Sequence, residues 1–194
     1  MNQSNQPNTP MNPINIENLL SRMQQEDMRN KKLMKGVFVI YLVLSIVYAL
    51  FLVVNPDPDL SLIDRISGLC YVFAFLLGSL YFRREYTMYK NMDYTLPLMQ
   101  LLEKTEKRYR FFSRKWLPVT GVVVLINVGI SLSLWHRPTM WNGSTLERMI
   151  ITEAIFWTVM FISGYIGYLR WKARSYPIWK DTKSLLDELK DETS

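Results

Sequence analysis

This sequence has very few of the side chains that bind metals or form covalent bonds. Its 194 residues include one cysteine, Cys70, and one histidine, His136. A lone cysteine forms no disulfide within the chain, and one cysteine with one histidine makes no zinc site. The chain also contains no glycine-rich phosphate loop, no HExxH pair and no nucleophile motif beside His136. We therefore expect no enzyme, no bound metal and no cofactor.

Charged residues are almost missing from four long stretches. Segments 36–54, 66–82, 117–135 and 149–169 contain no lysine or arginine, and only the last contains an acid, Glu153. A helix needs about 20 apolar residues to cross a hydrocarbon core of about 30 Å, and each segment is close to that length. A spanning segment must satisfy its own backbone hydrogen bonds, and these runs are continuous rather than alternating, which indicates helices. The sequence predicts an all-α fold, an integral membrane four-helix bundle; the alternative, a buried helix of a soluble core, would have to occur four times.

Lysine and arginine are distributed unequally between the connecting segments. Twenty of them fall in 1–35, 83–116 and 170–194, against three in 55–65 and 136–148. An excess of positive charge in short loops marks the cytoplasmic side of a membrane protein. We expect a multi-pass protein of the cell membrane with both termini in the cytoplasm. The net charge of +6 then reflects topology and attraction to anionic lipids, and it needs no nucleic acid to explain it.

The segments predicted to lie outside the membrane contain stretches that would form helices with one apolar and one polar face. Thr95 is expected to cap a helix that begins near Pro97, and Ser144 or Thr145 to cap the fourth span. Periodic apolar residues predict three cytoplasmic amphipathic helices. We expect a disordered start at 1–13 and no signal peptide. An amphipathic helix at 14–35 then leads into a first hairpin of spans at 36–82. A linker at 83–116, which contains a helix at 96–115, connects it to a second hairpin at 117–169 and an amphipathic tail at 170–194.

One face of the predicted 96–115 helix is a candidate partner-binding surface. It consists of apolar and aromatic residues at helical spacing: Leu98, Leu101, Leu102, Tyr109 and Phe112. Such a stripe lies on the membrane, packs on another helix, or binds another protein. If it binds a protein, charges placed at Leu101, Leu102 and Tyr109 abolish that binding without unfolding the bundle.

Glu153 lies inside the fourth span, where an ionisable side chain costs a few kcal/mol on insertion scales. The third span runs in the opposite direction, so Ser131 and Ser133 lie at a matching depth and Asn127 lies nearer the centre. A hydrogen bond from these residues would lower the cost of the carboxylate. We favour a polar clasp between the two spans over a carboxylate that binds a proton or a cation.

Pairs of small residues at a spacing of four predict close packing between the spans. They are Ser45/Ala49, Ala74/Gly78, Gly129/Ser133 and Ser163/Gly167.

Three hypotheses for the function follow. The first is a non-enzymatic, membrane-anchored adaptor or regulatory subunit that presents its cytoplasmic helices to a protein partner. The second is a small transporter or channel subunit that works as a homo-oligomer, with Glu153, Asn127 and Ser131 on a polar path. The third is a membrane enzyme acting on lipid, for which the sequence offers no nucleophile. The partners expected are the lipid bilayer, a cytoplasmic protein or a second copy of the chain, and no nucleic acid.

Overall fold

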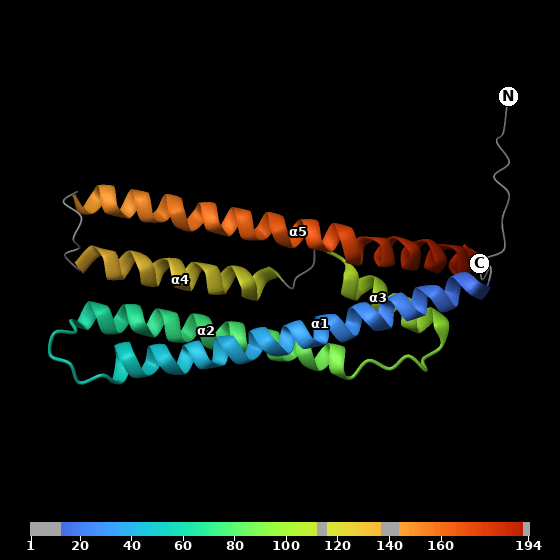
Figure 1. Cartoon of the computed structure of the whole chain (residues 1–194), viewed down its shortest axis with the longest axis horizontal. Helices are drawn as coiled ribbons and strands as arrows, with labels where there is room; N and C mark the ends of the chain where they lie inside the picture. Colours follow the sequence, from blue (N-terminus) through green and yellow to red (C-terminus); the bar gives the residue numbers. More distant parts are fainter. Residues whose placement is uncertain (1–12, 112–115, 137–143, 192–194) are drawn as a thin grey trace, which may run out of the picture.

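The computed structural model describes residues 13–111, 116–136 and 144–191. These residues form five helices and no strand. Figure 1 shows two long antiparallel hairpins, α1 with α2 and α4 with α5, and the short helix α3 near the end where α1 begins and α5 finishes. The helices are α1 (Pro13–Tyr48), which continues as a π-helical stretch (Ala49–Val54), α2 (Leu62–Lys90), α3 (Leu98–Tyr109), α4 (Trp116–His136) and α5 (Thr145–Asp191).

Four of the five helices are long and apolar enough to cross a membrane. The four predicted spans fall within α1 with its π-helical continuation, α2, α4 and α5. The predicted all-α fold with four long apolar helices is thus confirmed, and it indicates a membrane protein. Below, residues 36–82, 116–136 and 145–169 are called the apolar half, and residues 16–35, 83–111 and 170–191 the polar half.

Two elements predicted as separate are single helices. The predicted amphipathic helix 14–35 and the first span form one 36-residue helix with a π-helical end, and the fourth span continues through the tail as one 47-residue helix. Gly36 at the first junction costs only about 1 kcal/mol relative to alanine, too little to end a helix that is packed on either side of it, at Met23 in the core and at Tyr41 against α2. Pro177 lies inside α5, which nevertheless continues to Asp191.

The predicted helix caps fare differently. Ser144 and Glu147 form a reciprocal capping box at the start of α5, with N···O distances of 2.9 and 3.3 Å, so the predicted cap is confirmed. The prediction for Thr95 is wrong: its hydroxyl donates to Asp93 Oδ1 at 2.7 Å, and Pro97 occupies the N-cap position of α3. Helix α3 is also shorter than predicted, because it ends at Tyr109.

In the apolar half, α2 packs against both α1 and α4, whereas α5 makes few contacts with α4. Ala74 is fully buried, and a Cβ added at Gly78 would meet the Tyr41 ring. A Cβ at Gly129 would lie 2.9 Å from Cε1 of Tyr71. These small residues allow the close approach predicted from their spacing. Gly167 in α5 differs, since a Cβ there would meet no atom within 4 Å.

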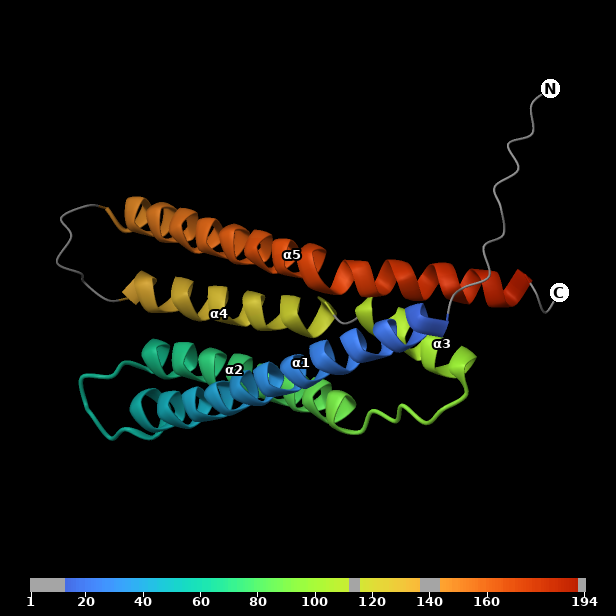
Figure 2. The same cartoon turned by 45° about the vertical axis from the view of Figure 1, so that its right-hand side comes forward.

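The amphipathic stripes of the polar half pack on one another. Of the three fates left open by the sequence, the structure shows mutual burial, with α1, α3 and α5 supplying one hydrophobic core. Figure 2 shows these three helices converging at the same end of the molecule. The core residues are Leu19, Met23, Leu101, Leu102, Tyr109, Ile178, Leu185 and Leu186.

Candidate functional site

The predicted partner-binding face of α3 is occupied by the chain itself. Leu101, Leu102 and Tyr109 are 2%, 1% and 3% exposed, and they pack in the core formed with α1 and α5. Leu98 is half-buried against the same core, and Phe112 lies outside the described residues. Three of the five candidate residues are thus buried within the chain and offer no free surface in this arrangement, and partner binding through this face stays a prediction. The stripe was real, but the tertiary structure covers it with two other helices.

A buried polar network at the centre of the polar half was not predicted. Asp27 of α1 accepts a hydrogen bond from the Tyr109 hydroxyl at Oδ1 and another from the Tyr94 hydroxyl at Oδ2, both at 2.6 Å. The Arg108 guanidinium lies 3.1 Å from the same Oδ2, and both charged side chains are 3% exposed. This network joins α1 to α3 and to the linker that precedes it.

Arg108 is held on several sides. Its Nη2 donates to Thr105 Oγ1 at 3.3 Å and its Nη1 contacts the Met92 sulfur. The guanidinium carbon lies 5.2 Å from the Tyr109 ring centroid and 5.8 Å from that of Tyr89, distances at which a cation is attracted to an aromatic face. Asp27 supplies the opposite charge that a buried guanidinium requires.

The tyrosines of this network remain protonated donors at neutral pH. Burial raises the pKa of Tyr109 above the usual range, and the charge of Asp27 and the hydrogen bond to it raise that pKa further. The pKa of Tyr94 is raised by the same causes, burial first and then the hydrogen bond to Asp27. Burial and the nearby charge of Glu85 raise the pKa of Tyr89. An ionised tyrosine would face the Asp27 carboxylate, so the neutral form is favoured.

The sequence did carry a signal for this network. Asp27 follows Leu19 and Met23 at a spacing of four, which places an acid in line with the apolar stripe of α1. Arg108 lies seven residues after Leu101 and so falls on the buried face of α3. A charged residue in register with an apolar stripe indicates a buried, partnered charge.

The second polar cluster joins the α4–α5 hairpin and contains three of the four residues predicted for it. Asn127 Nδ2 donates to Glu153 Oε2 at 2.7 Å, and Ser131 Oγ lies 2.9 Å from Glu153 Oε1. The predicted hydrogen bonds from the third span to Glu153 are thus present. Ser133 is half-buried on the same helix, and the described bonds to Glu153 do not involve it. The alternative, that the Glu153 carboxylate binds a proton or a cation, stays a hypothesis.

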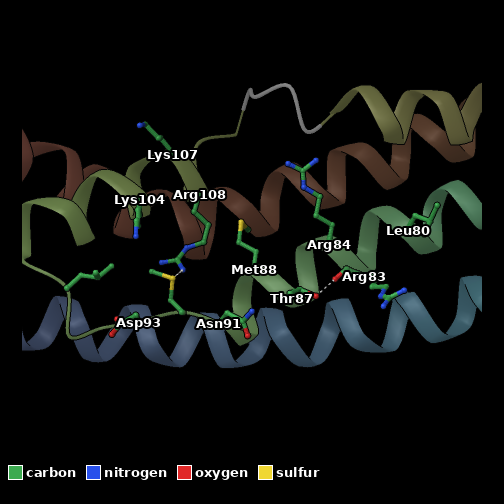
Figure 3. Close-up of a pocket in the computed structure, with 12 residues that line it drawn as sticks. Leu80, Arg83, Arg84, Thr87, Met88, Asn91, Asp93, Lys104, Lys107 and Arg108 are labelled. Carbon is green, nitrogen blue, oxygen red and sulfur yellow. Dashed lines mark hydrogen bonds between the residues drawn. The ribbon is translucent and has the colours of Figure 1, made fainter.

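A large pocket opens where the end of α2 meets α3. It has a volume of about 800 Å³, and Figure 3 shows its side chains contributed by α2, the linker and α3. It is lined by Leu80, Arg83, Arg84, Thr87, Met88, Asn91, Met92, Asp93, Leu96, Lys104, Lys107 and Arg108.

A smaller pocket of about 500 Å³ lies where the polar extensions of both hairpins meet, and it is lined by aromatic rings and arginines from α1, α2, α3 and α5. In the part of the chain that the structure describes, no group of three or more His, Cys, Asp or Glu side chains gathers to hold a metal ion. Comparison with protein-family models, with curated proteins and with solved structures finds no match to this chain.

Proposed function

We propose that this chain is a multi-pass protein of the cell membrane with both termini in the cytoplasm, and that it works as a non-enzymatic adaptor or regulatory subunit. The four apolar helices support its insertion in a bilayer. The concentration of lysine and arginine in the polar half supports the orientation, because positively charged short loops stay on the cytoplasmic side.

The observation that carries the regulatory role is the continuity of α1 and α5. Each helix runs without interruption from its apolar segment into the core of the polar half. The Asp27–Arg108 ion pair then ties α3 to α1. Because packed helices shift as rigid elements between discrete arrangements, a displacement of a span moves the polar bundle with it. A protein bound to that bundle would respond to the state of the spans.

The partner would contact the outer surface of the polar bundle, since the apolar stripes are buried. This surface is charged and includes exposed α5 residues such as Lys180 and Asp187. A photo-crosslinking amino acid at either position should capture one cytoplasmic protein in a fixed ratio to the chain in native membranes. The same amino acid at Asp59, exposed in the loop between α1 and α2, provides the matched control.

The two outcomes are distinct. Capture of the same protein from positions 180 and 187 but not from 59 would support the adaptor and its orientation. Crosslinks that join only copies of this chain, or identical products from all three positions, would refute it.

A second candidate function is an oligomeric transporter or channel subunit. The observation that favours it is the carboxylate of Glu153 held between Asn127 and Ser131 within the apolar half. The apolar segment of α5 is also largely exposed, with Phe161 at 75%, which leaves a face for a second copy. A polar path would then run along this hairpin.

Flux measurements in proteoliposomes test this second function. Glu153→Gln removes the charge but keeps the side-chain shape, so transport should stop while the oligomeric state is unchanged. Glu147→Gln, which alters the α5 cap six residues earlier, is the control and should transport normally. Normal flux in Glu153→Gln would eliminate this candidate.

A further inference from the structure

We propose that the pocket between the end of α2 and α3 binds the phosphate headgroup of an anionic lipid together with the first part of its acyl chain. This inference goes beyond the adaptor role, and it rests on the proposed insertion of α2 with its polar end on the cytoplasmic side. It rests on the charge, the apolar residues and the position of the pocket, taken in turn below.

The charge of the pocket is strongly positive. Five of its twelve lining residues are lysine or arginine and one, Asp93, is acidic. Arg108 is neutralised by Asp27, and the described ion pairs include none of the other four cations. Hydrogen bonds from Thr95 and the charge of Lys104 lower the pKa of Asp93, which is therefore ionised. The pocket still has more unneutralised positive charge than Asp93 balances.

The arrangement of these cations suits a phosphate group. Arg83 and Arg84 come from α2, and Lys104 and Lys107 come from α3; Figure 3 shows Arg83 and Lys107 turned outward, away from each other. Arginine presents a planar fork of donors to phosphate oxygens, and lysine adds a mobile point charge. These side chains are long and flexible, so a monoanionic or dianionic headgroup that enters the pocket draws them towards it from both helices.

Of the six uncharged side chains that line the pocket, Thr87 and Asn91 are polar and the other four are apolar. Leu80, Met88, Met92 and Leu96 line it, and Leu80 is 61% exposed on the last apolar turns of α2. A free phosphorylated metabolite gains little from such residues, but an acyl chain does, at about 0.8 kcal/mol for each buried methylene group. The lining therefore fits an amphiphile, because it combines cations from both helices with four apolar side chains.

The position of the pocket matches the surface of a bilayer. From Leu80 to Asn91, the residue that caps the end of α2, the lining extends over eleven helical steps, about 16 Å at the helical rise. The headgroup layer of one leaflet is about 5–8 Å thick. The pocket therefore begins at the hydrocarbon edge, crosses the headgroup layer and ends in water. Anionic lipids are concentrated on the cytoplasmic face, the side proposed for this end of the chain.

Native mass spectrometry of the detergent-purified full chain tests the proposal. Phosphatidylglycerol and phosphatidylcholine are titrated separately, and glycerol phosphate is added as a headgroup without a chain. We expect phosphatidylglycerol to bind at least tenfold more tightly than phosphatidylcholine, and glycerol phosphate to compete poorly. Efficient competition by glycerol phosphate would overturn the lipid assignment, because it would show that the site takes a soluble phosphate compound.

The site is assigned by two charge-matched double variants. Lys104→Gln with Lys107→Gln removes two exposed lysines that line the pocket, and Lys172→Gln with Lys180→Gln removes two exposed lysines of α5 that do not. The first pair should weaken phosphatidylglycerol binding about tenfold or more, and the second less than twofold. Equal losses in both pairs, or no preference of the unmodified chain for phosphatidylglycerol, would overturn the proposal. Unfolding curves of both variants should match the unmodified chain, since all four lysines are exposed.

Discussion

Replacement of Asp27 by alanine should destabilise the polar half far more than the loss of a surface ion pair. The variant leaves the Arg108 guanidinium 3% exposed without its counter-ion. It also removes the acceptor of two tyrosine hydroxyls. Removal of one partner of a buried ion pair typically costs about 3–5 kcal/mol, because the remaining charge is desolvated and uncompensated.

Hydrogen exchange of the α3 amides in detergent measures this effect locally. Helix α3 is tied to α1 by the Asp27–Arg108 pair and to α5 by the Trp171 indole, which donates to the Tyr109 carbonyl at 2.9 Å. A loss of about 3 kcal/mol corresponds to a more than hundredfold increase in the open population, since every 1.4 kcal/mol is a factor of ten. Exchange in α3 should accelerate by that factor, while α2 and α4 change little.

Two further variants make this prediction refutable. Asp181→Ala breaks a surface ion pair with Arg22, in which the side chains are 49% and 41% exposed, and should cost less than about 1 kcal/mol. Asp27→Leu combined with Arg108→Met removes both buried charges and should recover much of the stability lost in Asp27→Ala. If Asp27→Ala costs no more than Asp181→Ala, or if the double variant recovers nothing, the network does not stabilise the fold as argued.

Three other predictions follow from packing and from titration. Leu102→Ala should cost about 2–5 kcal/mol in the free energy of unfolding, because the side chain is 1% exposed in the core; a loss below 1 kcal/mol in denaturant titration would contradict this. Gly129→Ala should cost about 1–3 kcal/mol through crowding between α4 and α2, whereas Gly164→Ala, which meets nothing within 4 Å, should be neutral or stabilising by up to about 1 kcal/mol in thermal melts. Because the folded pKa values of Tyr94 and Tyr109 are raised, their contribution to stability is complete below the ordinary tyrosine pKa of about 10 and decreases as pH rises above it. Tyrosinate absorbance should show this, and replacing both by phenylalanine should flatten the alkaline decline in stability; an unchanged decline would contradict the assignment.

Much of the fold follows from local pattern. Continuous apolar runs of spanning length predicted the four long helices, and the cap expected at Ser144 or Thr145 predicted the start of α5. The Glu153 cluster was predictable because antiparallel spans of known length fix which residues share a depth. The boundary of α3 was not predictable from Thr95, because its hydroxyl bonds Asp93 in the linker instead of the helix end.

The sequence by itself determined the helical composition and the separation into an apolar and a polar half. It also determined that Glu153, within an apolar segment, must accept hydrogen bonds from a neighbouring helix. These depend on period, length and polarity along the chain, which act within a few turns. Only the tertiary structure decided that the α3 stripe is buried and that Asp27 meets Arg108 across 81 residues of sequence. An apolar stripe indicates that one face of a helix will be buried, but it does not indicate which element will bury it, because the hydrophobic effect is non-directional. The buried charges then favour the arrangement in which they pair. An arrangement that buries the same stripe but leaves one charge unpaired loses several kcal/mol through uncompensated desolvation.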